Sequence, residues 1–230
     1  MKTVLQFLED LSQNNNREWF LHHKAEFLQA QNRFQELATE VLQQMKEFDM
    51  DLQGLTMKDC TYRIYRDVRF SADKRPYKTH FGCVMSKGGR KSGYMGYYFQ
   101  VGVEEEWPNL VAVGHYQCLP QVVQVVREDI ENGGEDFKQI INQVDSRLKL
   151  DDSIALKRVP KGFSLDSPNA DYLRLKNYCL VYSLPHEQLF TPYWQQELLT
   201  MFKSAKPFVD YINRAIEYVQ EEQREYPKYF

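Results

Sequence analysis

The sequence predicts an α+β fold, in which an antiparallel sheet of about five strands packs against long N-terminal and C-terminal helices. Apolar residues recur at helical spacing up to residue 48, and short β-rich runs separated by glycine occupy 60–117. Helical patterns return after residue 120. Because helices, strands and helices follow one another as blocks, the order favours α+β over a βαβ array. The 230 residues fit one large domain, 1–230, with no visible linker.

Two helices are expected before the sheet. Thr3 is the expected cap of the first, whose apolar stripe is Val4, Leu5, Phe7, Leu8 and Leu11. Asn16 is the expected cap of a second helix of roughly 30 residues, with Glu18 in its first turn. Large apolar residues recur along it every seven positions: Phe20, Phe27, Phe34, Val41 and Phe48.

The central block predicts a sheet of strands joined by short loops. The expected strands are 61–70, 79–86, 94–103 and 110–117, with a fifth at 175–182. Residues 87–93 and 104–109 are predicted to form hairpin loops. Such short connections indicate antiparallel pairing.

Four helices are expected in the second half of the chain. One covers about 120–131, and another follows Gly133 and Gly134 and runs to Leu148. Pro207 is expected to divide the C-terminal segment into helices over 192–204 and 207–223, since proline cannot donate a helical hydrogen bond.

Composition excludes several classes of protein. A net charge of −3 and a pI near 6.0 argue against a protein that coats nucleic acid. No run of apolar residues is long enough for a transmembrane helix, and the first ten residues lack a signal-peptide core. The four cysteines are widely spaced, and the five histidines form no metal-binding motif. We therefore expect a cytoplasmic protein with no membrane contact, no metal and no cofactor.

Positive charge is concentrated in one window of the chain. Residues 58–91 contain ten Lys or Arg and three Asp, a balance of +7, whereas the remainder carries −10. The acidic C-terminal helix, which includes Glu217, either forms a solvated face or docks against this window. The window is the expected location of a functional site.

Alternation along the predicted strand 61–70 separates its side chains into two faces. Thr61, Arg63, Tyr65, Asp67 and Arg69 form a polar face, at which we expect a concave pocket. The opposite face is apolar except for Arg66, whose guanidinium must meet a carboxylate or a bound anion. The two alternatives are an anionic ligand and one of four helix carboxylates: Glu18, Glu26, Glu197 or Glu217.

A basic turn follows this strand. Ser71 and Asp73 favour a turn closed by local side-chain hydrogen bonds. The turn would present Lys74, Arg75 and Lys78 together, either to an anion or simply to solvent.

The segment Arg63-Ile-Tyr-Arg-Asp-Val-Arg-Phe-Ser-Ala-Asp-Lys-Arg-Pro-Tyr-Lys78 resembles the signature of an uncharacterised family, domain of unknown function 2461. Residues 14–20 and 158–163 are similar to two further landmarks of that family, and 114–120 match a fourth more loosely. The resemblance implies one domain and singles out the basic segment. It supplies no activity and no catalytic residues.

Three hypotheses for function follow. The first is a domain, or an enzyme, that binds a phosphate- or carboxylate-bearing ligand; Asp67 and Asp73 are then the candidate acid–base residues. The second is a non-catalytic module that binds an acidic protein or, as a less favoured partner, nucleic acid. The third is a purely structural arginine network. The expected ligand-binding residues are Arg63, Tyr65, Arg66, Arg69, Lys74, Arg75, Tyr77 and Lys78.

Overall fold

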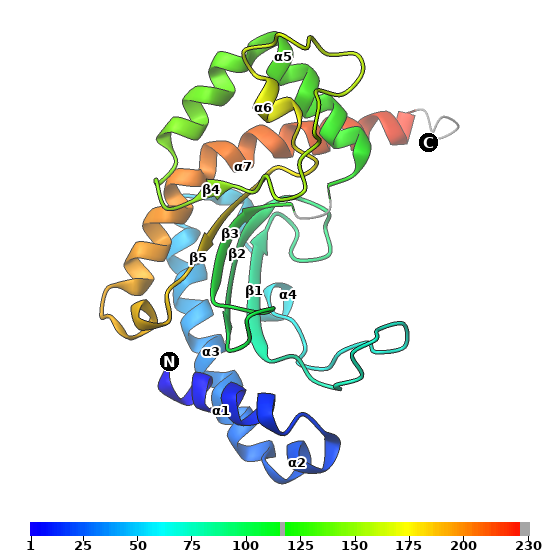
Figure 1. Cartoon of the computed structure of the whole chain (residues 1–230). Coiled ribbons are helices and arrows are strands. Elements are labelled where there is room, and N and C mark those ends of the chain that lie inside the picture. Colours follow the sequence, from blue (N-terminus) through cyan, green and yellow to red (C-terminus); the bar gives the residue numbers. More distant parts are fainter. Residues whose placement is uncertain (116–117, 226–230) are drawn as a thin grey trace.

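The structure is a computed structural model that describes residues 1–115 and 118–225 (Figure 1). The N-terminal elements are α1 (Lys2–Gln13), α2 (Arg17–His22), α3 (Lys24–Met45), η1 (Met50–Leu52) and α4 (Met57–Cys60). The central strands are β1 (His80–Ser86), β2 (Gly96–Gly102) and β3 (Leu110–Gly114). The remaining elements are α5 (Pro120–Gln143), β4 (Lys149–Leu150), α6 (Ala170–Leu173), β5 (Cys179–Ser183), η2 (His186–Phe190) and α7 (Trp194–Glu225).

The sheet has five strands in the order β1-β2-β3-β5-β4, and every neighbouring pair is antiparallel. The predicted strands 79–86 and 94–103 are confirmed as β1 and β2, joined by the predicted hairpin. The predicted strand 110–117 corresponds to β3, although its residues 116–117 lie outside the described part of the chain. The predicted fifth strand begins later, at Cys179, and the short β4 was not predicted. The α+β prediction is thus confirmed.

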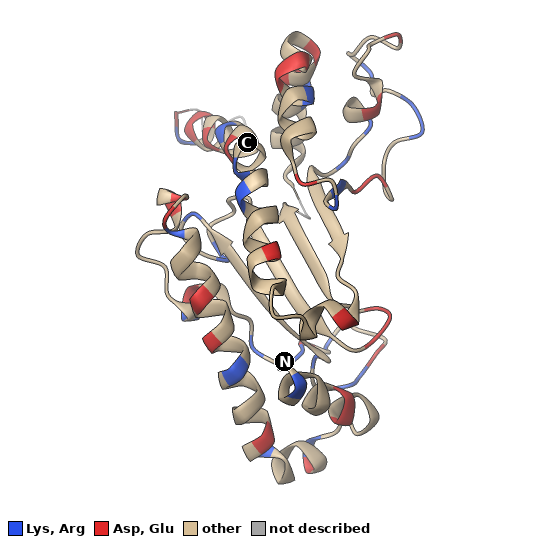
Figure 2. Cartoon of the chain, turned by 90° about the vertical axis from the view of Figure 1, so that its left-hand side faces the viewer, with Lys and Arg blue, Asp and Glu red and all other residues tan. Residues whose placement is uncertain are grey.

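Helices α1, α3 and α7 cover one face of the sheet, as Figure 2 shows from the helical side. Alternate strand residues on that face are large and apolar, because successive side chains of a strand point to opposite sides. The ring of Phe34 on α3 lies 5.6 Å from the ring of Phe81 and 5.4 Å from that of Phe99. Phe202 on α7 lies 5.3 Å from Tyr97. The core therefore lies between this face and the helices.

The N-terminal helices differ in part from the prediction. The side chain of Asn16 accepts a hydrogen bond from the backbone N–H of Trp19 at 2.9 Å, so the predicted cap is confirmed. The predicted continuous helix is wrong, because it is interrupted at His23, whose ring stacks on Trp19 and whose Nδ1 lies 2.8 Å from the Trp19 carbonyl oxygen. Thr3 is not a cap either, since α1 begins at Lys2.

Of the two predictions for the later helices, the interruption of α5 is confirmed and the division of the C-terminal helix is wrong. Gly133 has non-helical angles and interrupts α5, as predicted, but the second part ends at Gln143 instead of Leu148. Pro207, in contrast, lies inside the continuous helix α7. Pro207 and Lys203, the residue four positions before it, are both exposed, so water can satisfy the carbonyl that proline leaves without a donor.

The predicted strand 61–70 is wrong. Residues 62–78 form an extended loop, here called the basic arm, which projects past the end of β1 in Figure 1. The arm folds back on itself: the N–H of Arg66 donates to Pro76 at 2.9 Å, and the N–H of Lys78 donates to Ile64 at 2.8 Å. The segment pairs with the returning residues 76–78 only through these two hydrogen bonds and the isolated bridge between Tyr65 and Tyr77, and Pro76 has no N–H to donate, so no continuous ladder forms.

The acidic C-terminal helix contacts the basic window through Glu217. Lys87, the residue that follows β1, forms an ion pair of 2.6 Å with Glu217 of α7. The docking alternative is therefore the correct one for Glu217. This contact fastens the β1–β2 hairpin to the helical layer.

Candidate functional site

The second face of the sheet forms the floor of a cavity of about 890 Å³. A volume of this size is typical of small-molecule sites. Residues at alternate positions of four strands point to this face and line the cavity: His80, Val84 and Ser86 from β1, Gly96, Tyr98 and Gln100 from β2, Leu110, Ala112 and Gly114 from β3, and Cys179 and Val181 from β5. Many of these residues are small, which leaves room above the strands. The basic arm and the loop 103–109 close one end.

A short chain of hydrogen bonds crosses the floor. The hydroxyl of Tyr98 donates to the side-chain oxygen of Gln100 at 2.7 Å, and the amide of Gln100 donates to the carbonyl of Pro108 at 2.7 Å. Gly82 permits this arrangement, because a Cβ there would lie 2.5 Å from the Tyr98 hydroxyl. Burial raises the pKa of Tyr98, so its hydroxyl remains a donor at neutral pH.

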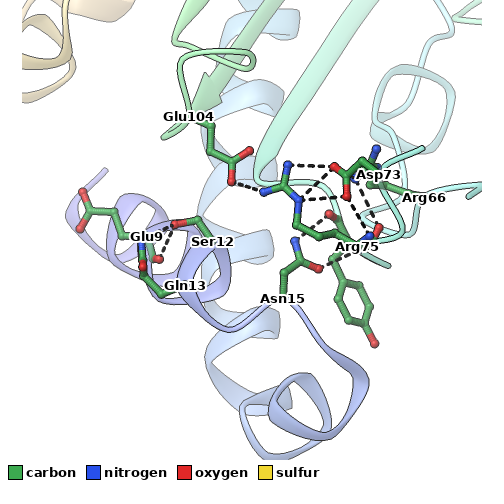
Figure 3. A network of polar contacts seen from close by, with 9 residues as sticks. Glu9, Ser12, Gln13, Asn15, Arg66, Asp73, Arg75 and Glu104 are labelled. Atoms are coloured by element: carbon green, nitrogen blue, oxygen red, sulfur yellow. Dashed lines mark hydrogen bonds and ion pairs between the residues drawn. The ribbon is translucent and has the colours of Figure 1, made fainter. Parts of the chain in front are cut away.

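The arm is held at the cavity by an arginine–carboxylate network (Figure 3). Asp73 accepts from Arg66 at 2.5 Å and from Arg75 at 2.9 Å, and Arg75 also reaches Glu104 at 2.5 Å. Hydrogen bonds from Arg75, followed by those from Arg66, lower the pKa of Asp73. Bonds to Asp73 and Glu104 raise the pKa of Arg75. The network joins the arm to the loop that follows β2.

Asn15, which lies in the connection between α1 and α2, holds the base of the arm. The side chain of Asn15 donates to the Tyr77 carbonyl at 3.0 Å and accepts from the Tyr77 N–H at 3.1 Å. The Tyr77 ring stacks on Phe20, with ring centres 4.0 Å apart and planes 15° from parallel. Two segments far apart in sequence thereby fix the residue that precedes Lys78.

Lys78 differs from Arg66, Arg69 and Arg75, because no carboxylate in the described part of the chain lies within ion-pair distance, 4.0 Å, of its amine. Lys78 is half-buried in the cavity wall, and its Nζ lies 5.1 Å from the centre of the Tyr62 ring. Burial, and then the charges of Arg63 and Arg66, lower the pKa of Lys78. A positive charge without a protein counter-ion therefore faces the cavity.

Two aromatic rings form the adjoining wall. His80 stacks on Trp107 with ring centres 4.6 Å apart, and both residues line the cavity. His80 is 8% exposed, and its Nδ1 has no hydrogen-bond partner in the described structure. Burial, assisted by the charge of Lys78, lowers the pKa of His80 to about 4. The imidazole is therefore neutral at pH 7.

The predicted ligand-binding residues separate into two groups. Four of them line the cavity: Arg66, Arg75, Tyr77 and Lys78. The other four do not, namely Arg63, Tyr65, Arg69 and Lys74, because the segment is an arm and not a strand with a polar face. The expected concave pocket lies beside the arm instead, over β1 to β5.

Three of the arm's four arginines, Arg66, Arg69 and Arg75, pair with carboxylates of the arm, whereas no ion pair is described for Arg63. Arg66 pairs with Asp73 and with none of the four helix carboxylates expected as its protein partners, because the arm folds back and brings Asp73 beside it. Asp67 binds Arg69 at 2.7 Å on the exposed side. Neither of the candidate acid–base residues, Asp67 and Asp73, lines the cavity.

Sequence reasoning missed most of the floor and the aromatic wall, including His80, Tyr98, Gln100 and Trp107. Alternation along β2 was the available signal: Gly96, Tyr98 and Gln100 share one face, whereas Tyr97, Phe99 and Val101 share the other. Arg90, Tyr94 and His115 line the distant end and were not selected either.

The described residues contain no cluster of three or more metal-ligating side chains. None of the helices in residues 1–115 and 118–225 is long and apolar enough to cross a membrane.

The fold and cavity define an α+β protein with one face of its sheet buried by helices and a ligand-sized hollow on the other. The chain matches the family model described as "Conserved hypothetical protein (DUF2461)" over residues 3–211, and it belongs to that family. Comparison with curated proteins gave no match, and comparison with solved structures gave none either.

Proposed function

We propose that this protein binds a small organic anion, a carboxylate or phosphate ester, in the cavity on the sheet. The anionic group contacts Lys78 and Arg66 at the end closed by the basic arm. The remainder of the ligand lies against Tyr62, Tyr98 and Trp107.

The observation that carries the proposal is the unpaired amine of Lys78 in the cavity wall. Removing an ammonium from water without a counter-charge is unfavourable, so an anionic guest would stabilise this arrangement. Arg66 can assist, because its hydrogen bonds to Asp73 and to the Arg75 carbonyl both come from Nη1. Its remaining N–H groups make no hydrogen bond to the described residues.

The character of the other walls supports an organic ligand over a bare ion. Tyr62, Tyr98 and Trp107 present aromatic surface, and Val84, Leu110 and Val181 present aliphatic surface. Sites for small molecules typically combine such apolar surface with a few polar groups that fix orientation. A planar ring with one acidic substituent matches this combination.

Isothermal calorimetry with benzoate, 4-bromobenzoate, phenyl phosphate and inorganic phosphate tests the proposal, with benzamide as the neutral analogue. We expect the aromatic anions to bind and benzamide to bind at least about tenfold more weakly, since charge-assisted hydrogen bonds are strong. Lys78→Gln should weaken anion binding by a similar factor.

Lys74→Gln is the matched control, because Lys74 lies on the same arm but outside the cavity, where its Nζ donates to the Val68 carbonyl at 3.0 Å. The control should bind as the wild type does. Absence of binding for every anion, or equal losses in the two variants, would contradict the proposal.

A second candidate is a contact between the arm and an acidic protein, or nucleic acid. One observation favours it: Phe70 is 97% exposed on the arm, and the guanidinium of Arg69 lies 5.8 Å from its ring centre. Phe70→Ala should then abolish capture of the partner while leaving calorimetric anion binding unchanged, and nucleic-acid binding should fall steeply with salt. The arginine network at Asp73 supports a structural role for Arg66 and Arg75 under either candidate.

A further inference from the structure

The surroundings of Lys78 are those that make a lysine amine nucleophilic. The residue is half-buried in a largely apolar cavity, and no described carboxylate pairs with it. Two cationic side chains, Arg63 and Arg66, act on it electrostatically. Desolvation and nearby positive charge both favour the neutral amine over the ammonium, which is how reactive lysines are activated in proteins.

The other groups around the amine leave it available for reaction. The ring of Tyr62 lies 5.1 Å below Nζ, and His80 on β1 is neutral at pH 7 because its pKa is lowered to about 4. Of the acidic groups at this end, Asp73 binds two arginines and Glu104 binds Arg75, whereas Glu106 lines the cavity, is exposed, and forms no ion pair with Lys78. No described side chain therefore holds the amine in its protonated form by an ion pair.

We propose that Lys78 forms an imine with an aldehyde or ketone that also carries a carboxylate or phosphate group. This inference rests on the proposed function, because Arg66 holds the acidic group while the carbonyl carbon lies at the Lys78 amine. Arg66 is suited to this role because its Nη1 is already fixed by Asp73, which orients its remaining N–H groups.

The reaction needs no oxidant, reductant or metal. The lone pair of the neutral Nζ forms a bond to the carbonyl carbon, and the carbonyl π electrons move to oxygen, which takes up a proton. Loss of a proton from nitrogen and of the hydroxyl group as water leaves a carbon–nitrogen double bond. Amine and carbonyl compound thus give imine and water, with protons exchanged with the water of the open cavity.

Reductive trapping on the whole protein tests the inference. Pyridoxal 5′-phosphate is a suitable probe, because it is a planar aldehyde with a phosphate group, and borohydride converts its imine into a stable secondary amine. Peptide mapping by mass spectrometry then locates the label. At low probe concentration we expect label on Lys78 in at least about tenfold excess over exposed Lys74, and unphosphorylated pyridoxal should label Lys78 about tenfold less.

Lys78→Arg tests the imine directly, because arginine keeps the charge but forms no stable imine. We expect the variant to lose the label at residue 78, and calorimetry of the wild type with phenyl phosphate measures the anion site separately. The matched control, Lys74→Arg, should keep the label at Lys78. Excess phenyl phosphate should protect Lys78 of the wild type.

Two results would overturn the inference. If phenyl phosphate binds but Lys78 is labelled no faster than Lys74, imine formation is excluded and the anion site stands. If Lys78 is labelled equally by the phosphorylated and unphosphorylated probes, and phenyl phosphate neither binds nor protects, the anion site is excluded and the specificity proposed for the carbonyl ligand is wrong.

Discussion

Lys78 and Arg75 lie three residues apart on the basic arm, yet their charges serve different purposes. Arg75 is saturated by Asp73 and Glu104, whereas Lys78 has no described carboxylate partner and lies in the cavity wall. A saturated guanidinium contributes to structure, and its net effect on stability is small where solvent screens it. Under the proposed function, the unpaired amine of Lys78 is the group that contacts the anionic ligand.

His80 gives a prediction about pH at the same scale. Its pKa is lowered to about 4 in the folded protein, against about 6.5 in an unfolded chain. A histidine whose folded pKa is depressed contributes stability above pH 6.5, and that contribution is lost as the pH falls toward 4. Between pH 7 and pH 4, the wild type should therefore lose about 2–3 kcal/mol more unfolding free energy than His80→Gln loses.

Urea denaturation between pH 7 and pH 4 measures this difference. His22→Gln is the matched control, since His22 is exposed on α2, and it should leave the pH dependence unchanged. An identical pH dependence in wild type and His80→Gln would show that His80 is not held neutral by burial.

At the scale of elements, the base of the arm depends on a residue from the connection between α1 and α2. Asn15 makes two hydrogen bonds to the Tyr77 backbone, and the stacking of Tyr77 on Phe20 adds an aromatic contact. Two segments that are widely separated in the sequence therefore meet here, and one positions the other.

Asn15→Ala should therefore loosen the arm. The loss of both hydrogen bonds should lower the unfolding free energy by about 1–3 kcal/mol and leave the Tyr77 N–H unpaired. Amide hydrogen exchange at Arg66 and Lys78 should accelerate, because these amides close the arm. Asn14→Ala is the control, since Asn14 is exposed and its side chain donates only to the nearby Asp10 carbonyl in the described structure. Unchanged exchange at both amides in Asn15→Ala would contradict the clamp.

The elements also show what local sequence can predict. Strands β1, β2 and β3 have alternating or apolar residues bounded by glycine, and these signals are local. The segment 61–70 alternates equally well, but a strand also needs a partner ladder, and that depends on residues 76–78 folding back. Pairing of this kind is set by tertiary structure, so alternation alone gave the wrong element.

The candidate site was predictable to the same limited degree. Charge density indicated the arm and hence Lys78, Arg66 and Arg75. Alternation along β2 separates Tyr98 from Tyr97, but it does not say which of these faces the helices cover. The positions of α3 and α7 decide this, because they cover the face that carries Tyr97 and leave the face that carries Tyr98 as the cavity floor.

At the scale of the whole molecule, the chain combines a net charge of −3 with a window of +7 in residues 58–91. The internal network and the Lys87–Glu217 pair neutralise part of that window. The positive charge that remains beside the cavity lies at Lys78 and the unpaired N–H groups of Arg66 at one end, and at Arg90 at the other. A local positive potential in an acidic molecule favours small anions over extended polyanions.

The most direct test is a crystal structure of the protein with 4-bromobenzoate, collected at the bromine absorption edge. We expect a bromine anomalous peak in the cavity among Tyr62, Tyr98 and Trp107, with the carboxylate within hydrogen-bond distance of Lys78 Nζ. An empty cavity at a concentration that saturates the calorimetric signal, or a bromine peak elsewhere on the molecule, would contradict this expectation.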